Sequence, residues 1–116
     1  MSNDSSNIAV HNEPSLEVVQ LELLLDLADL IAQGFEAALL SVLDDVDGQI
    51  LFNHRLDGDP QYQRVAAVMV GADADVALVF LDRSGTTTHV EGAAESDRAI
   101  AREAEKARNR VLAAQA

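Results

Sequence analysis

The clearest pattern of apolar and polar positions lies between Pro14 and Gly34. Pro14 or Ser15 suits a helix start and Gly34 suits a helix end, so the segment predicts one long helix. Polar residues recur on one narrow stripe of this helix, and apolar residues cover most of the remaining circumference. So wide an apolar surface packs against two neighbours, one of which can be a second subunit. The residues expected to contact a dimer partner are Leu21, Leu24, Leu25, Ala28 and Ile31.

Residues 35–47 fit two kinds of element. Their apolar positions have a helical spacing, whereas the run "AALLSVL" also suits a buried strand. We favour the strand because the following "QILFNHRL" alternates, with Ile50, Phe52 and His54 on one face, as a half-buried strand does. The intervening "DDVDG" is then predicted to be a hairpin turn.

The remaining chain predicts a second hairpin and a closing helix. Residues 62–71 fit either a short helix or a buried strand, whereas "VALVFLD" and "TTTHVEG" read as strands joined by "RSG". The last segment, "AAESDRAIAREAEKARNRVLAAQA", has a helical composition. The predicted class is α+β, with a long N-terminal helix, a small antiparallel sheet of two hairpins and a C-terminal helix. A flexible polar arm, residues 1–12, precedes a single domain, residues 13–116.

Length and composition narrow the classes of function. The chain has 116 residues, enough for one modest core, and its 3% aromatic content makes that core aliphatic. The absence of cysteine excludes disulfides, thiol nucleophiles, zinc ribbons and iron–sulfur clusters. No stretch has the pattern of a signal peptide or the roughly 20 apolar residues of a membrane span. We therefore expect a cytoplasmic protein without membrane association.

The charge of the chain is strongly acidic and unevenly distributed. Net charge is −12, and residues 1–97 contain 18 acidic and three basic residues. Residues 98–116 contain five basic and two acidic residues. Direct binding of nucleic acid is not expected, because that affinity depends on basic residues that neutralise phosphates. Adaptation to high salt, complementarity to a basic partner and solubility alone all remain open as explanations of the acidity.

The aspartates of "DDVDG" match the ligand pattern of a calcium loop only in part. With Gly48 at loop position 6, Asp45 and Asp47 occupy positions 3 and 5, but Leu43 and His54 stand where two further ligands are required. The aspartates therefore predict a solvated turn. The sequence contains no phosphate-binding glycine motif.

Histidines and hydroxyl residues supply the other candidate chemistry. His54 and His89 fall on different predicted strands, where carboxylates could join them, whereas His11 lies in the arm. Asp82, Ser84 and His89 are the residue types of a serine hydrolase, but Ser84 lacks the "GxSxG" elbow that exposes a nucleophile. We therefore predict no catalytic, cofactor-binding or metal site and no enzymatic activity.

The stretch "LADLIAQGFEAALLSVLDDVDGQILF" resembles the start of a roadblock/dynein light chain domain. The matching positions are Ala37 to Leu43, the Asp47–Gly48 pair and the Ile50–Leu51 pair, and they cover about a third of the chain. The resemblance implies a dimeric, non-catalytic scaffold of the kind that serves small GTPases or motors. The family has a second helix before three further strands, and residues 60–92 offer little room for all of these.

Two functional hypotheses follow. The first is a small acidic interaction module, an adaptor, chaperone or regulator, that forms a homodimer through its apolar first helix. The alternative is an acidic inhibitor or nucleic-acid mimic that occupies a basic groove of a partner protein. In both, the partner is another protein, and no cofactor is required.

Overall fold

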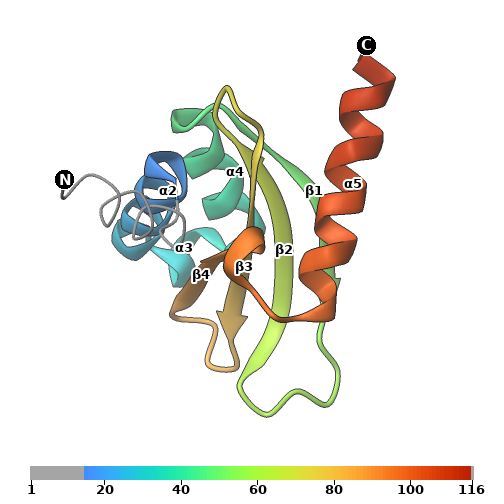
Figure 1. The fold of residues 1–116 in the computed structure, drawn as a ribbon. Helices are drawn as coiled ribbons and strands as arrows, with labels where there is room; N and C mark the ends of the chain where they lie inside the picture. Colours follow the sequence, from blue (N-terminus) through green and yellow to red (C-terminus); the bar gives the residue numbers. More distant parts are fainter. Residues whose placement is uncertain (1–14, 116) are drawn as a thin grey trace, which may run out of the picture.

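The computed structural model describes residues 15–115, and within them helices lie at both ends and strands lie between (Figure 1). This arrangement confirms the α+β class. The predicted arm, residues 1–12, lies outside the described residues. The elements are α2 (Leu16–Leu27), α3 (Leu30–Gln33), α4 (Phe35–Asp45), β1 (Gly48–Arg55), β2 (Tyr62–Val70), β3 (Asp75–Asp82), β4 (Thr88–Gly92), the 3-10 helix η1 (Ala93–Glu95) and α5 (Ala99–Gln115).

The predicted long N-terminal helix is wrong, because the segment forms two helices, α2 and α3. Ser15 begins α2, and its hydroxyl accepts a hydrogen bond from the N–H of Val18 at 3.2 Å. Ala28 then has an extended backbone, with φ −76° and ψ 146°. Asp29 starts α3, because its carboxylate accepts a hydrogen bond from the N–H of Ala32 at 3.0 Å. A polar residue inside the apolar pattern thus acts as a helix cap.

The prediction of a strand at residues 35–47 is also wrong. Gly34, with φ 84°, separates α3 from α4, and the chain is helical from Phe35 to Asp45. The helical spacing prevails because it buries one side of α4, whereas Leu40 on the other side is 52% exposed. The "DDVDG" segment consequently joins α4 to β1 and is no hairpin. The buried side chains of this segment are Phe35, Ala38, Leu39, Val42, Leu43 and Val46.

The four strands form one antiparallel sheet in the order β1-β2-β3-β4. Each strand pairs with the next along the chain, so the two separate hairpins of the prediction are replaced by a continuous meander. The predicted strands around "RSG" are β3 and β4, and residues 62–70 are strand β2. The alternation of β1 is interrupted by a bulge between Ile50 and Phe52. As a result Ile50 packs on one face of the sheet and Phe52 on the other.

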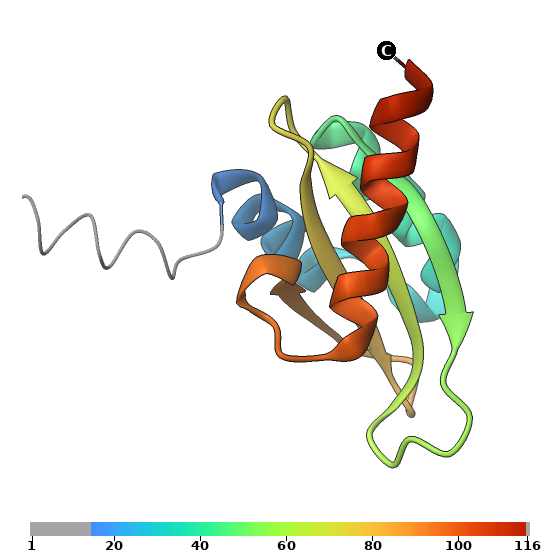
Figure 2. The same cartoon turned by 45° about the vertical axis from the view of Figure 1, so that its right-hand side comes forward.

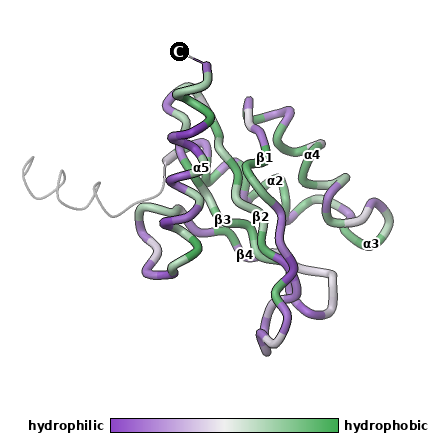
Figure 3. The backbone as a smooth tube through the Cα atoms, turned by 90° about the vertical axis from the view of Figure 1, so that its right-hand side faces the viewer, coloured by the Kyte–Doolittle hydropathy of each residue, from purple (hydrophilic) through white to green (hydrophobic). Residues whose placement is uncertain are grey.

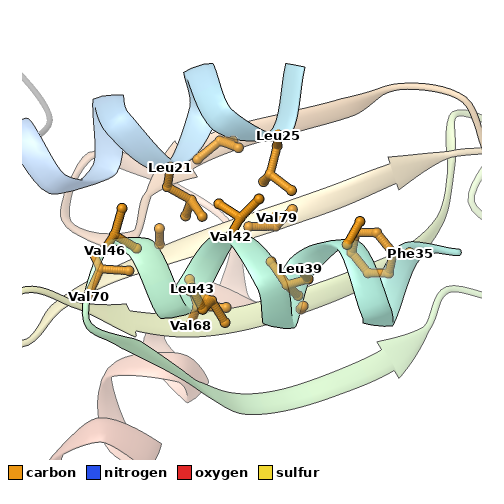
Figure 4. Packing of buried hydrophobic residues seen from close by; sticks show 14 of the residues in the cluster. Leu21, Leu25, Phe35, Leu39, Val42, Leu43, Val46, Val68, Val70 and Val79 are labelled. Atoms are coloured by element: carbon orange, nitrogen blue, oxygen red, sulfur yellow. The ribbon is translucent and has the colours of Figure 1, made fainter. Parts of the chain in front are cut away.

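Helices cover both faces of this sheet, which makes three layers (Figures 2 and 3). The α2–α4 layer packs on one face, where its leucines and valines meet Val68, Val70 and Val79 (Figure 4). Helix α5 packs on the opposite face, over a cluster that includes Leu78 and Phe80. The central strands β2 and β3 are therefore buried on both sides, which accounts for their continuous apolar sequences.

The contact between α5 and the sheet is made by small side chains. Ala101, Ala104 and Ala107 are the buried residues of this helix. Alanine lets the helix approach the strands closely, but each alanine buries little apolar area. The C-terminal end of α5 extends past the sheet (Figures 1 and 2), and Leu112 there is 40% exposed.

Candidate functional site: the outer face of helix α2

Three leucines on α2 point away from the core. Leu16, Leu23 and Leu27 are 68%, 58% and 83% exposed. Their spacing puts them on one side of the helix, opposite the buried Val18 and Leu21. We call Leu16, Leu23 and Leu27 the outer leucine stripe. A row of large exposed aliphatic side chains is typical of a surface that contacts another protein.

The five residues predicted to contact a partner occupy different environments. Leu21 and Leu25 are 0% and 1% exposed and pack between α2, α4 and the sheet (Figure 4). Leu24 and Ala28 are partly buried against the same core, and Ile31 on α3 is 77% exposed. Leu21 and Leu25 thus contact their own chain, and a role of these five in a dimer stays a prediction.

The wide apolar arc of the sequence indicated that α2 has two apolar sides. It did not indicate which leucines face the core, because apolar residues surround most of the helix. The leucines that face the core are determined by where the strands and α4 lie, and the sequence of this segment alone carries no information on that.

A shallow hollow of about 200 Å³ adjoins the outer leucine stripe. It lies between α2 and the end of α4, and Leu23, Leu24 and Val46 give it an aliphatic lining. Gln20 and Asp45 complete its rim. A hollow with aliphatic walls and polar edges suits one apolar side chain of a partner.

Acidic residues flank the outer leucine stripe along α2, and the α2–α4 layer itself contains no Lys or Arg. Residues 15–54 contain no Lys or Arg, so the first basic residue along the described chain is Arg55. Glu22 and Asp26 directly precede Leu23 and Leu27. The α2–α4 layer therefore has a negative potential around an apolar centre. Its acidic residues are Glu17, Glu22, Asp26, Asp29, Glu36, Asp44 and Asp45.

A polar cluster with possible chemistry lies elsewhere, where β4 leads toward α5. Glu91 Oε2 accepts hydrogen bonds from Ser96 Oγ at 2.6 Å and from Arg98 Nε at 2.9 Å. Glu91 Oε1 lies 3.0 Å from His89 Nε2. The Arg98 guanidinium also lies 4.6 Å from the centre of the Phe80 ring, a cation–π contact. These contacts join β3 and β4 to the segment that starts α5, so the cluster positions that helix.

The protonation of Glu91 follows from these contacts. Burial favours the neutral acid and by itself would raise the pKa of Glu91. The hydrogen bonds from Ser96, Arg98 and His89 favour the ionised form, and together they outweigh the effect of burial. The pKa of Glu91 therefore lies below its ordinary value. The group is therefore an ionised acceptor at neutral pH, and both of its oxygens are engaged within the cluster.

The two strand histidines are not brought together. His54 and His89 belong to one row across the sheet, through Val65 and Phe80. Because β1 and β4 are opposite edges, the row separates the histidines by about 14 Å, three strand spacings. They cannot share a ligand at that separation. His11 lies outside the described residues.

The candidate hydrolase residues form a turn. The Asp82 carboxylate accepts hydrogen bonds from Thr87 Oγ1 at 2.7 Å and from Ser84 Oγ at 2.8 Å. The backbone N–H groups of Gly85, Thr86 and Thr87 also donate to Asp82. These hydrogen bonds lower the pKa of Asp82 to about 2, and the bond from the Thr87 hydroxyl has the largest effect. Asp82 thus stabilises the β3–β4 turn, while His89 pairs with Glu91 instead.

Carboxylates elsewhere act in the same local way. Asp59 accepts hydrogen bonds from the N–H groups of Gln61 and Tyr62 at 2.8 and 2.9 Å, and the latter bond is the main cause of its lowered pKa. Asp47 occupies the turn before β1 with φ 54°. Among residues 15–115, no three His, Cys, Asp or Glu side chains are placed to hold a metal ion.

The described part of the chain has no helix with the length and apolar character needed to cross a bilayer.

Residues 37–43, which the roadblock resemblance matches to the segment before its turn, lie in α4, and strands β2, β3 and β4 lie within residues 62–92. Comparison with known proteins found no matching family model, no matching curated protein and no matching solved structure, so the roadblock relationship stays a prediction.

Proposed function

We propose that this protein is a non-enzymatic protein-binding module whose partner docks on the outer leucine stripe. The observation that carries this proposal is the exposure of Leu16, Leu23 and Leu27, at 58% or more each, on a helix whose other side is fully packed. Removing such side chains from water is favourable by about 1.5–3 kcal/mol each when burial is complete. The hollow beside Leu23 adds a place for one apolar anchor.

The charge of the α2–α4 layer indicates the kind of partner. A second copy placed face to face would bring two acidic surfaces together, which costs free energy at low salt. A partner segment with apolar residues flanked by Lys or Arg would match both the stripe and its acidic rim. We therefore infer a basic, amphipathic partner segment.

The polar clusters support the non-enzymatic part of the proposal. The Ser84 hydroxyl is hydrogen-bonded to Asp82, and the oxygens of Glu91 are engaged by Ser96, Arg98 and His89. Asp82, Ser84 and His89, the residue types of a hydrolase, are therefore each engaged in a structural contact.

A capture experiment tests the proposal. Immobilised wild-type protein is compared with Leu23→Ser/Leu27→Ser in a lysate of the native source, and Leu40→Ser serves as the matched control. Leu40 is 52% exposed on α4 and lies outside the stripe. We expect the stripe variant to lose a captured protein that the control keeps, with unchanged circular dichroism. Equal capture by all three proteins would contradict the proposal.

A second candidate, an acidic inhibitor of a basic groove, is favoured by the absence of Lys and Arg from residues 15–54. In that case electrostatic attraction supplies most of the binding affinity, and the outer leucine stripe contributes little. Glu22→Gln/Asp26→Asn would then reduce capture more than Leu23→Ser/Leu27→Ser, and capture would fall steeply with salt.

A further inference from the structure

Three arginines line one hollow at an end of the sheet. The first 97 residues contain 18 acidic residues but only three basic ones, Arg55, Arg64 and Arg83. All three line a hollow of about 220 Å³, together with Leu56, Asp57 and Gln63. This site, which we call the arginine hollow, lies beside the β1–β2 connection at the bottom of Figures 1 and 2. Every lysine or arginine of these 97 residues is therefore found at one place.

Arg55 and Arg64 face each other across two neighbouring strands. They are paired in the register of β1 and β2, so both side chains lie on the same side of the sheet. Like charges at directly opposite positions destabilise a strand pair. Arg64 Nη1 donates a hydrogen bond to Asn53 Oδ1 at 3.2 Å, and this acceptor is neutral. An anion bound between the two guanidinium groups would relieve their repulsion.

Arg83 directly follows β3 and reaches the hollow from the other side of β2. Its Nε donates a hydrogen bond to the Asp59 carbonyl oxygen at 2.6 Å, and its Nη2 donates to the Leu56 carbonyl oxygen at 3.2 Å. Gln63 Nε2 in turn donates to the Asp82 and Arg83 carbonyl oxygens at 3.0 and 3.2 Å. These bonds hold the guanidinium in place before any ligand binds. Within residues 15–115 its Nη1 has no protein acceptor.

The lining of the arginine hollow has an excess of positive charge. Its three guanidinium groups share the hollow with one carboxylate, that of Asp57, which leaves a net charge of +2. Asp57 Oδ1 lies 3.9 Å from Arg55 Nε, beyond hydrogen-bond distance. Among the described residues, neither Arg64 nor Arg83 forms an ion pair with a carboxylate. The hollow therefore has unpaired positive charge in a chain whose net charge is −12.

Two acidic residues near the hollow are engaged within their own loops. The Asp59 carboxylate accepts hydrogen bonds from the N–H groups of Gln61 and Tyr62. The Asp82 carboxylate accepts those of the β3–β4 turn. Neither residue is part of the lining. An anion in the hollow therefore meets guanidinium groups rather than the oxygens of these acids.

Charge and shape together select the class of anion. A phosphate monoester carries about −1.5 to −2 charges at pH 7 and has three strong acceptor oxygens. It thus matches both the net charge of the lining and three guanidinium groups that come from three segments of the chain. A carboxylate has one charge and two oxygens, so it would leave part of this positive charge unpaired.

The size of the hollow limits what else it holds. Sites for whole drug-sized ligands usually measure about 300–1,000 Å³, and the arginine hollow is smaller. Its lining also contains no aromatic ring on which a nucleobase could stack. The lining therefore suits a single anionic group, with the remainder of the ligand outside.

We propose that the arginine hollow binds the phosphate group of a phosphate monoester. Arg64 and Arg83 hold this group from β2 and from the β3–β4 turn, and the more exposed Arg55 covers it from β1. The hollow shares no residue with the outer leucine stripe, so this inference does not rest on the proposed function. A bound phosphate would join the β1–β2 connection to the β3–β4 turn.

An NMR titration of the full chain tests the inference. Inorganic phosphate and glycerol 3-phosphate are added at constant ionic strength, and backbone amide shifts are followed. We expect saturable shifts in the β1–β2 connection and the β3–β4 turn. Arg64→Gln should weaken binding by about tenfold or more, because a hydrogen bond between charged groups is lost. The control is Lys106→Gln, which removes the same charge from an exposed position on α5 and should bind like wild type.

A second variant guards against a folding defect. Arg55→Gln changes a side chain that is 75% exposed, and it should weaken binding severalfold while circular dichroism stays unchanged. Arg83→Gln is unsuitable, because Arg83 also holds the β1–β2 connection.

Further ligands test the class of anion and its source. Dimethyl phosphate has the same shape but one charge and two free oxygens, and acetate is a carboxylate, so both should bind at least about tenfold more weakly than glycerol 3-phosphate. A phosphoserine peptide distinguishes the sources of the phosphate group. Tighter binding of the peptide would assign the group to a phosphorylated protein, and equal or weaker binding would assign it to a small molecule.

Several outcomes would overturn the inference. These are the absence of saturable shifts around the arginine hollow, acetate that binds as tightly as phosphate, and Arg64→Gln that binds phosphate like wild type. An equal loss of binding in Lys106→Gln would show that net charge, and not this hollow, attracts the anion.

Discussion

The Asp29 carboxylate accepts a hydrogen bond from the N–H of Ala32 at 3.0 Å, and this contact starts a new helix inside an otherwise continuous apolar segment. It turns the chain between α2 and α3, and α4 then packs against α2 (Figure 4). The outer leucine stripe ends at this turn.

Removal of this cap is expected to destabilise the fold modestly. Asp29→Ala leaves the N–H of Ala32 without its side-chain acceptor, and loss of such a cap costs about 1 kcal/mol. Urea unfolding followed by circular dichroism measures the change. Asp26→Ala is the control, since it removes an exposed carboxylate of α2 that caps no helix. Equal stability of wild type and Asp29→Ala would show that the cap does not hold the turn.

Gly48 is expected to tolerate no side chain. A Cβ at this position would lie 2.7 Å from Leu43 Cδ2 and 3.0 Å from the Met69 carbonyl oxygen. Gly48→Ala should therefore lower the free energy of unfolding by about 1–3 kcal/mol, the usual cost of overpacking. Thermal unfolding tests this, with the exposed neighbour Gln49→Ala as the control. A Gly48→Ala protein as stable as that control would mean that α4 and β1 are less tightly packed.

The Asp82 turn predicts a specific dependence of stability on pH. The folded pKa of Asp82 is about 2, below the value of about 3.9 in an unfolded chain. Ionised Asp82 thus stabilises the fold fully above about pH 4, and this contribution disappears as pH falls toward 2. Asp82→Asn should be less stable than wild type at neutral pH, by about 1 kcal/mol.

The difference between the two proteins should shrink between about pH 4 and pH 2, because wild-type Asp82 becomes protonated there. Urea midpoints measured across this range provide the test. Asp73→Asn, which changes an exposed acid in the β2–β3 connection, is the control. A constant difference at all pH values would contradict the assignment to Asp82.

Salt is expected to stabilise the α2–α4 layer. Glu22 and Asp26 are four residues apart on α2, so their like charges repel on one side of this helix. Each such pair costs about 0.2–0.5 kcal/mol at low salt and less when salt screens it. The melting temperature should therefore rise with sodium chloride, and Glu22→Gln/Asp26→Asn should raise it at low salt and reduce the dependence. The same salt response in wild type and variant would place the repulsion elsewhere.

Sequence patterns predicted those parts of the fold whose periodicity is unambiguous. The presence of strand β1, of the β3–β4 pair and of α5 follows from alternation, turn residues and helix propensity, but the predicted common face of Ile50 and Phe52 is wrong because the bulge between them puts the two side chains on opposite faces. Residues 35–47 were assigned wrongly because their apolar positions fit both periods, and burial against α2 and the sheet decided between them. The break at Asp29 was missed because an apolar pattern that continues through a cap does not reveal it.

The candidate site was predicted at the level of the helix but not of its residues. The excess of apolar positions predicted packing on two sides of α2; leucines do lie on both its buried and its exposed side, and the second contact stays a prediction. Leu21 and Leu25 face inward, however, and Leu23 and Leu27 face outward, which depends on where the sheet lies. The pairing of Glu91 with Ser96 and Arg98 was likewise missed, since it needs the turn from β4 into η1.

The alanine contact of α5 has a consequence for how the molecule opens. Ala101, Ala104 and Ala107 bury little apolar area, and α5 is the element that covers its face of the sheet. Detaching this helix should cost less free energy than unfolding β2 and β3, which are buried on both sides. Backbone amides of α5 are therefore expected to exchange with deuterium before those of the central strands. Such partial opening would briefly uncover Phe80 and Leu78 while the opposite helical layer stays folded.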